Sequence, residues 1–431
     1  MNVIFLTMSR LTDISQRHIY TDLLRKFRNE GHSVYIVSPN ERSFGRPTEL
    51  VDKNGVHILG VKTLNLQKTS IIEKGIGQVL VESQYKKAIK KYLKGVSLDL
   101  ILYSTPPITF PNVIKFLKKR NPNVKTYLLL KDIFPQNAVD MGMLVVSPIP
   151  TPQGKGLIKA LMTLPKYLLY LYFRRKEKIL YELSDYIGCM SPANVEYVIK
   201  HNPEVSAERV EVAPNSIELE LMTYEDGQEK AEKYYIRKKY QLPTDRPIFI
   251  YGGNLGKPQG IDFLINCLDV NKHRKDCFFV IIGNGTEYSK LLTWMNDVSN
   301  KKEDICVKLM QRLAKEDYDI LVKYCDVGLI FLDHRFTIPN YPSRLLSYLE
   351  NKMPIICATD VNTDIGVIAK ENGYGYWCES VKPEDFTALV DKMLASDMKA
   401  MGEIGYQFLK ENYLVEHTYN AIMKHFQGSK V

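Results

Sequence analysis

The stretch of residues 337–360, TIPNYPSRLLSYLENKMPIICATD, limits the possible folds more than any other part of the chain. Two prolines hold its first residues out of the helical region, and Ser343 follows as the N-cap of a helix expected over 344–351. A proline then ends the helix, and residues 355–358 have the short apolar pattern of a buried strand. A helix followed by a buried strand is one αβ unit of a parallel sheet.

The start of this helix predicts an anion site. The free backbone N–H groups of a first helical turn carry partial positive charge, and Ser343 and Arg344 stand beside them. Such a site suits a phosphate or a diphosphate. The alternative is an ordinary capped helix without a ligand, and the stretch alone leaves both interpretations open.

The amino-terminal half has the same alternation of strands and helices. Residues 3–8 predict a first strand rather than a secretion signal, and a later strand at 125–130 ends close to Asp132. Ligands in open α/β sheets bind beyond the carboxyl ends of the strands, so Asp132 is the first carboxylate that we expect to act in catalysis. A simple turn or helix cap is the alternative role.

A second turn of the phosphate-binding type follows a strand at 248–251 and reads GGNLGKPQG. Its glycines, Gly253 among them, let backbone approach a ligand closely, and Lys257 supplies a point charge. The strand at 278–282 ends in a similar turn at Gly283. No serine or threonine follows the lysine as in nucleoside-triphosphate loops, so an ATPase is disfavoured.

A chain of 431 residues is too long for one ordinary core, so two domains are expected. We place a first domain at 1–217, a charged linker at 218–246, a second domain at 247–410 and a helix that crosses back at 411–431. The seven cysteines form no Cys-x-x-Cys pair, which argues against a disulfide framework and a zinc site and fits a reducing cytoplasm. No apolar run approaches the length of about 18 residues that a spanning helix needs.

The net charge of +9 is concentrated in the basic segment at 151–180. Seven basic residues there accompany a single acid, Glu177, and they alternate with leucines and tyrosines. A basic amphipathic helix pair of this composition suits the surface of an anionic membrane. The alternative is a pair of helices packed on the core with a solvated basic face. Nucleic acid is not an expected partner, because these residues form no recognised motif.

Six segments, taken in their order and spacing, resemble the retaining glycosyltransferases of the GT-B fold, family four, and within it the bacterial capsule and O-antigen type. They are LKDIFPQNAVDMGML at 130–144, ELSDYIGCMSPANVEYV at 182–198, VAPNSIE at 212–218, GGNLGKPQGIDFLI at 252–265, VIIGNGTEYSKL at 280–291 and PSRLLSYLENKMPII at 342–356. The resemblance covers nearly the whole chain.

This resemblance implies an α/β protein of two Rossmann-like domains that face each other across a cleft. The second domain would bind a nucleotide sugar, with UDP as the expected nucleotide, and the first would bind a lipid-linked or growing polysaccharide acceptor. Such enzymes need no bound metal, because lysine, arginine and helix-start amides stabilise the diphosphate. The resemblance also implies a cytoplasmic enzyme that associates with the membrane.

Residue by residue, residues 253–260 match the diphosphate loop of the family. Asn254 stands where many members have arginine, and Gln259 stands where many have lysine, so Lys257 becomes the expected charge donor. Arg312 lies in the loop that usually reads the base. Together with Lys257, Arg344 would stabilise the departing diphosphate.

The largest departure concerns a pair of family glutamates separated by seven residues. The segment from Tyr341 to Ser347 matches the second half of that pattern, but the two glutamate positions hold Pro339 and Ser347. Ser347 is a weaker partner for the ribose hydroxyls, with Glu350 one turn further on as a replacement. The amides around Ser343 would then contact the donor sugar.

Two other functions stay open. One is a nucleotide-sugar epimerase on the same fold, which would release an altered UDP-sugar without an acceptor. The other is a catalytically silent protein of this fold that binds a partner, which the two missing glutamates keep open.

Overall fold

The computed structural model describes residues 1–66, 71–106, 108–147, 156–219, 228–300 and 304–426. It divides into unit 1, Met1–Glu218 with Val415–Val431, and unit 2, Leu219–Leu414. The expected helix pair of the basic segment begins at residues that lie outside the described ones.

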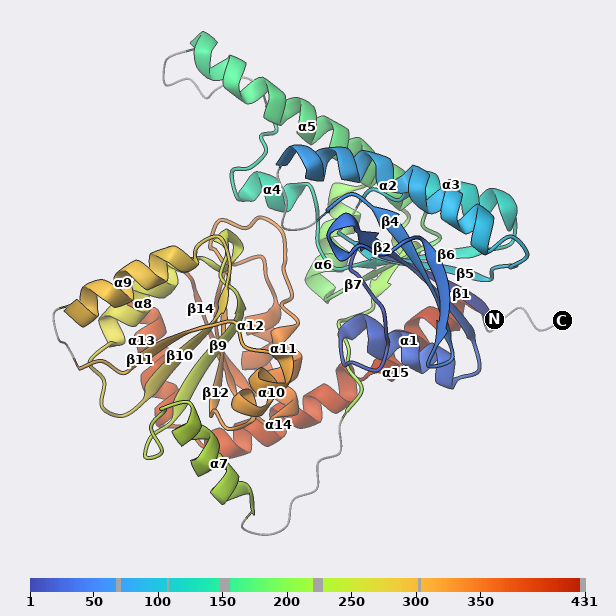
Figure 1. Cartoon of the computed structure of the whole chain (residues 1–431). Coiled ribbons are helices and arrows are strands. Elements are labelled where there is room, and N and C mark those ends of the chain that lie inside the picture. The colour runs from blue at the N-terminus through green and yellow to red at the C-terminus, as the bar shows by residue number, and fades with distance from the viewer. Residues whose placement is uncertain (67–70, 107, 148–155, 220–227, 301–303, 427–431) are drawn as a thin grey trace. The chain divides into compact units, whose positions relative to one another are not determined.

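Unit 1 is built on one eight-stranded sheet in the order β3-β4-β2-β1-β5-β6-β7-β8. All of its paired strands run parallel except β3 and β4. Helices α2, α3 and α5 cover one face of the sheet, and α1 and α15 cover the other (Figure 1). The strands are β1 Asn2–Leu6, β2 Ser33–Glu41, β3 Glu49–Lys53, β4 Val56–Thr63, β5 Leu100–Thr105, β6 Lys125–Leu130, β7 Tyr186–Cys189 and β8 Val210–Val212. The helices are α1 Ile19–Asn29, α2 Ile71–Tyr92, α3 Pro111–Arg120, α4 Gln136–Asp140, α5 Gly156–Leu183, α6 Pro192–His201 and α15 Val415–Met423.

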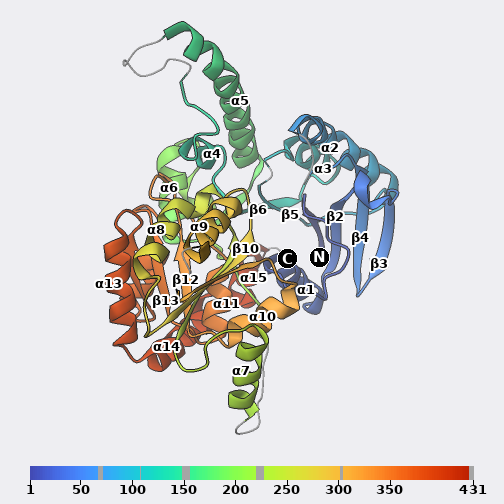
Figure 2. The same ribbon diagram turned by 60° about the vertical axis from the view of Figure 1, so that its left-hand side comes forward.

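Unit 2 has a six-stranded parallel sheet in the order β11-β10-β9-β12-β13-β14. Helices α8, α9 and α13 pack on one face through an apolar core, while α10, α11, α12 and α14 lie on the other side (Figures 1 and 2). The strands are β9 Ile248–Asn254, β10 Phe278–Asn284, β11 Val307–Gln311, β12 Val327–Phe331, β13 Ile355–Thr359 and β14 Gly375–Glu379. The helices are α7 Gln228–Lys239, α8 Ile261–Asn271, α9 Tyr288–Asn300, α10 Lys315–Lys323, α11 Arg344–Glu350, α12 Ile365–Glu371, α13 Pro383–Leu394 and α14 Met398–Asn412. The predicted fold class, an α/β protein with two Rossmann-like parallel sheets, is confirmed.

Helix α1 shows how sequence pattern becomes structure in unit 1. His18 caps it by accepting a hydrogen bond from the N–H of Tyr20, and Gly31 leaves the helix with φ of +79°. Its buried face, which includes Leu23 and Phe27, joins residues of the sheet and of α15 in one core. The cap and the glycine thus set the two ends of α1, and its apolar face holds it on the sheet.

The hairpin of β3 and β4 was not predicted. It turns at Asn54 and Gly55, which both have positive φ, 53° and 73°. Asn-Gly is the preferred dipeptide for this type of tight turn, because these two residues adopt positive φ at low cost. The sequence therefore held the signal for the hairpin.

Two expectations about helices need correction. The helix pair expected in the basic segment is one helix, α5, which continues through Pro165 although proline removes one backbone hydrogen bond. The linker expected at 218–246 contains α7, which packs on unit 2: Arg237 of α7 binds the carboxylate of Asp326 and the carbonyl of Tyr324, 3.0 Å away. The chain returns to unit 1 at Val415, four residues after the expected boundary.

Candidate active site

The carboxyl edge of the unit 2 sheet brings two glycines together. Gly253 near the end of β9 pairs with Gly283 of β10. A Cβ atom on Gly283 would lie 1.9 Å from the carbonyl oxygen of Gly253, so no side chain fits there. Gly253 has φ of +136°, which side chains rarely tolerate. Gly283 is buried in this close strand contact, whereas Gly253 is exposed, so bare backbone is open to a ligand at Gly253.

Arg344 lies directly against this backbone. It is the first residue of α11, and its guanidinium carbon lies 4.3 Å from the ring centroid of Tyr251. A Cβ on Gly253 would lie 3.2 Å from Nη2 of Arg344. The other terminal nitrogen, Nη1, is buried and has no hydrogen-bond partner among the described residues. A guanidinium always carries its charge, so a buried N–H without an acceptor is a place for an anionic oxygen.

Three tyrosines form the surroundings of this arginine, and sequence reasoning missed all of them. Besides Tyr251, the hydroxyl of Tyr348 accepts the N–H of Gly252 at 3.3 Å. A Cβ on Gly252 would lie 1.9 Å from the hydroxyl of Tyr318. Burial raises the pKa of Tyr348 to about 12, so this ring stays neutral. No carboxylate pairs with Arg344 in the ranges that the structure describes, and the phenols leave its charge available to a ligand.

In the loop after β9, two amide side chains stand at the positions where the resemblance implies cations. Nδ2 of Asn254 donates to Oε1 of Gln259 at 3.0 Å, and the same oxygen accepts the N–H of Gly256 at 3.2 Å. These side chains therefore fix the loop. Lys257 is exposed and makes no hydrogen bond or ion pair with any described residue, and Gly260 closes the loop with φ of +58°.

The remaining unit 2 candidates are less closely grouped. Ser343 stands at the N-cap position as expected, but its conformation is helical and its side chain caps nothing. The Tyr341 side chain is buried, and its hydroxyl is hydrogen-bonded to that of Tyr413. Ser347 and Glu350 lie one and two turns beyond Arg344 on α11, both partly exposed, and Arg312 is exposed just after the edge strand β11.

Asp132 follows β6 at the carboxyl edge of the unit 1 sheet. Both of its carboxylate oxygens accept hydrogen bonds from Nδ2 of Asn137, at 2.8 and 2.9 Å, and its backbone carbonyl accepts the Thr105 hydroxyl at 3.0 Å. Burial raises the pKa of Asp132 to about 6, although the hydrogen bonds from Asn137 and Ile133 lower it. A carboxylate with such a pKa can accept a proton near neutral pH.

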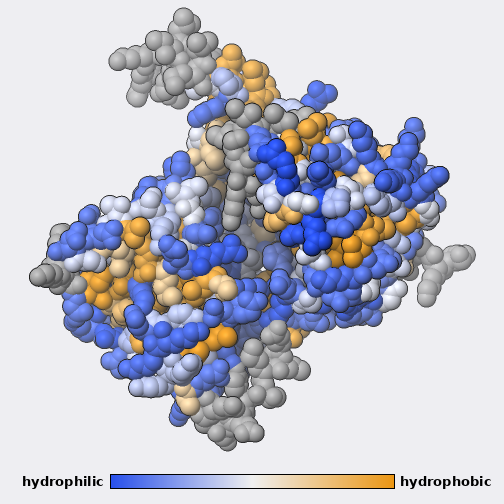
Figure 3. All heavy atoms as spheres, viewed as in Figure 1, coloured by the Kyte–Doolittle hydropathy of each residue, from blue (hydrophilic) through white to orange (hydrophobic). Residues whose placement is uncertain are grey.

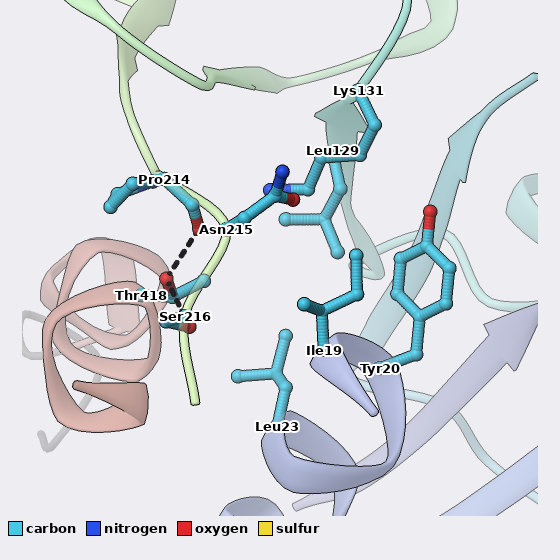
Figure 4. A pocket seen from close by; sticks show the side chains of 9 residues that line it. All are labelled: Ile19, Tyr20, Leu23, Leu129, Lys131, Pro214, Asn215, Ser216 and Thr418. Atoms are coloured by element: carbon cyan, nitrogen blue, oxygen red, sulfur yellow. Dashed lines mark hydrogen bonds between the residues drawn. The ribbon is translucent and has the colours of Figure 1, made fainter. Parts of the chain in front are cut away.

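Lys131 directly precedes Asp132 at the same strand end, and sequence reasoning did not select it. Its Nζ donates to the carbonyl of Ala213 at 3.1 Å, and it lines a small pocket with Asn215 and Tyr20 (Figure 4). Burial lowers the pKa of Lys131 to about 7. A signal existed in the sequence, because a lysine directly after a buried strand lies next to the core, and burial disfavours its charged form.

Three further observations concern the described residues as a whole. None of their His, Cys, Asp and Glu side chains form a group of three or more that could hold a metal ion. None of their helices is long and apolar enough to cross a membrane. All seven cysteines are buried and unpaired.

The sequence and the fold are similar to those of known glycosyltransferases. Residues 232–408 match the family model described as "Glycosyl transferases group 1". A probable glycosyltransferase of Pseudomonas aeruginosa, WbjE, is 22% identical over 352 residues, which are 80% of this chain and 78% of that protein.

Two solved structures share the fold over almost all of both chains. HepE of Anabaena in complex with UDP-glucose has a TM-score of 0.64 and 11% identity, with 99% of this chain and 100% of that chain covered. WaaG, a glycosyltransferase involved in lipopolysaccharide biosynthesis, has a TM-score of 0.59 and 12% identity, with 98% and 99% covered. The chain is a glycosyltransferase, and the group 1 region falls on unit 2, which holds Arg344 and the two glycines.

Proposed function

We propose that unit 2 binds the diphosphate of a nucleotide sugar at Gly253, Gly283 and Arg344, and that the enzyme transfers the sugar with retained anomeric configuration. One observation carries this proposal: a buried Nη1 atom of Arg344 without an acceptor, beside backbone that no side chain covers. A diphosphate oxygen supplies the missing acceptor and neutralises the charge.

Sugar transfer needs a group that stabilises the departing diphosphate and a group that accepts the proton of the acceptor hydroxyl. When the bond between the sugar and the diphosphate breaks, negative charge grows on the diphosphate, and Arg344 with the backbone N–H groups stabilises it. Lys257 adds a second charge. Asp132 of unit 1 orients the acceptor hydroxyl or takes its proton, for which a pKa of about 6 is suited.

The geometry of α11 indicates which residue takes the role of the missing glutamate at the ribose. A helix rises about 1.5 Å per residue, so Ser347 lies about 4.5 Å and Glu350 about 9 Å beyond Arg344 along the axis. Ser347 is the closer group for the ribose hydroxyls of the same nucleotide. We therefore assign the ribose contact to Ser347.

Relatives support a UDP-sugar donor and a surface glycan as product. HepE binds UDP-glucose, and WaaG acts in lipopolysaccharide biosynthesis. On this basis the donor is a UDP-sugar, and the acceptor is a lipid-linked or growing polysaccharide of a surface glycan. The enzyme then works at the inner face of the cell membrane as a peripheral protein.

A thermal-shift panel with UDP, GDP, ADP and CMP in the presence of a chelator tests the donor site. A ligand that binds the native state raises the melting temperature, so UDP should raise it selectively. Arg344→Ala should abolish that shift. If no nucleotide raises the melting temperature of the wild-type protein, the loss of the two glutamates has removed donor binding, and the chain is a catalytically silent relative of these enzymes. Release of an altered UDP-sugar without an acceptor would instead identify an epimerase.

A further inference from the structure

Helix α5 carries an apolar face that no described part of unit 1 covers. Its amino-terminal part stands clear of the rest of unit 1, and apolar atoms gather on its surface (Figures 1, 2 and 3). Leu164, Leu168 and Leu171 are 41%, 56% and 44% exposed, and Tyr172 is 44% exposed. We call Leu164, Leu168, Leu171 and Arg175 the outer stripe.

Helical geometry puts the outer stripe on one side of α5. Its members are spaced by four, three and four residues, which is the repeat of a single helix face. The opposite side holds the buried residues Glu177, Leu180 and Tyr181. A helix in a water-soluble surface ordinarily turns leucines inward and charges outward, and α5 turns both kinds outward.

The charges beside the outer stripe are mainly positive. Arg175 and Lys178 are exposed on this side, together with one exposed acid, Glu182. The acid of the basic segment, Glu177, is buried and pairs with Arg174, so it does not oppose a negative surface. Leucines at the level of basic side chains match the boundary of a membrane, where acyl chains lie beneath anionic headgroups.

A neighbouring loop contacts the side of α5 opposite to the outer stripe. Nζ of Lys166 donates to the carbonyl of Gly142 at 3.5 Å, which places the loop after α4 beside the helix. Met143 and Val146 of that loop are 52% and 54% exposed. Exposed apolar side chains therefore occur on this loop as well as on the outer stripe.

The inner side of α5 contacts the loop of the proposed catalytic residue. The rings of Phe173 and Phe134 meet edge to face with centroids 5.0 Å apart, and Phe134 is two residues after Asp132. We infer that α5 lies on an anionic membrane through the outer stripe and thereby holds the loop of Asp132 next to a lipid-linked acceptor. The second part of this inference rests on the proposed function, because that function supplies the acceptor.

Vesicle flotation of the full-length protein tests the membrane contact. The wild type should float with vesicles of phosphatidylcholine and phosphatidylglycerol, and more weakly with phosphatidylcholine alone. The triple variant Leu164→Glu, Leu168→Glu, Leu171→Glu should lose at least about tenfold in partitioning to the mixed vesicles, since three carboxylates would enter the acyl boundary.

The chain offers a matched control on unit 2. Val270, Leu292 and Ile320 are 53%, 44% and 42% exposed, close to the values of the three stripe leucines. Changing these three to glutamate adds the same charge and should leave flotation nearly unchanged. Equal loss in both triple variants would show a general charge effect and overturn the inference.

Two further measurements separate the possible failures. The UDP thermal shift of the stripe variant should equal that of the wild type, which shows an intact fold and donor site. A wild-type protein that shifts with UDP but does not float would overturn the membrane contact and leave the proposed function standing. A protein that floats but whose melting temperature no nucleotide raises would overturn the proposed function and leave the membrane contact standing.

A second copy of the chain is the rival occupant of the outer stripe. Sedimentation velocity distinguishes it: a dimer that the stripe variant dissociates would overturn the lipid assignment. Tryptophan fluorescence of Leu168→Trp also reports insertion. Its emission should shift to the blue when mixed vesicles are added, and the protein without vesicles should show no such shift.

Discussion

The carboxyl edges of the two sheets differ in their charged groups: one holds a permanent cation, and the other holds two groups that titrate near neutral pH. In unit 2, the half-buried Arg344 lies against the ring of Tyr251 and bare glycine backbone, and its buried Nη1 has no acceptor among the described residues. In unit 1, Asp132 is held by Asn137, and Lys131 is held by the carbonyl of Ala213. One edge keeps a fixed cation ready for an anion, whereas the other keeps groups whose protonation changes near neutral pH. The same fold thus provides either leaving-group stabilisation or proton transfer, according to which side chains follow its strands.

Removing the fixed cation should have the largest effect. Arg344→Ala is expected to lower kcat for nucleotide-diphosphate release about 10³-fold, because one group that stabilises developing charge contributes on this order. Arg344→Lys should recover part of it, since the charge stays but the fork geometry is lost. Lys275→Ala, which removes an exposed lysine paired with Asp304, is the control and should change little. Full activity of Arg344→Ala would remove the arginine from the site.

Replacing the proton acceptor should cost somewhat less. Asp132→Asn is expected to lower kcat/KM by about 10² or more while the UDP thermal shift stays unchanged. The pKa of Asp132 is raised to about 6, and the ionised form is the active one. For the wild type, kcat/KM should therefore rise with pH through about 6 and then level off. A variant that keeps this rise would assign the titration to another group.

Crowding the glycine pair should act on stability and on nucleotide binding together. Gly283→Ala places a methyl group 1.9 Å from the carbonyl of Gly253, so we expect a loss of about 1–3 kcal/mol in unfolding free energy and a weaker UDP shift. Gly95→Ala is the matched control, because a Cβ there meets no atom within 4 Å. Urea denaturation of both variants measures the difference. Equal unfolding free energies of the Gly283→Ala and Gly95→Ala variants would show that β9 and β10 can move apart without loss of stability.

The smallest effect is a pH-dependent change in melting temperature. Burial lowers the pKa of Lys131 to about 7, whereas an unfolded lysine titrates near 10.4. The folded state therefore binds this proton less tightly, and folding is penalised below pH 7 and progressively relieved between 7 and 10. Lys131→Met removes the penalty, so it should raise the melting temperature by a few degrees at pH 6, with the gain shrinking toward pH 10. A gain that is the same at both pH values would indicate packing as its cause.

The parallel sheets could be predicted because short apolar strands alternate with helices at regular intervals, and strand β6 was predicted with its observed ends. The glycine turns and Arg344 could be selected for the same reason, since glycine and a cation next to a strand end are visible in a single segment. The tyrosines around Arg344 could not, because Tyr318 and Tyr348 reach Gly252 from helices 66 and 96 residues further on. Ser343 was expected as a cap, but its observed helical conformation turns the hydroxyl away from that role.

The order of the two units along the chain has a consequence for folding during synthesis on the ribosome. The N–H of Val415 donates to the carbonyl of Ile217 at 2.9 Å, and the hydroxyl of Ser216 donates to that of Thr418 at 2.8 Å. Unit 2 is thus an insertion in unit 1, and the core of unit 1 includes Val415 and Ile422. Residues 1–218 emerge first but lack part of their core until residues 415–426 are made, whereas unit 2 is complete earlier. We expect the second unit to fold before the first, the reverse of the usual order along a nascent chain.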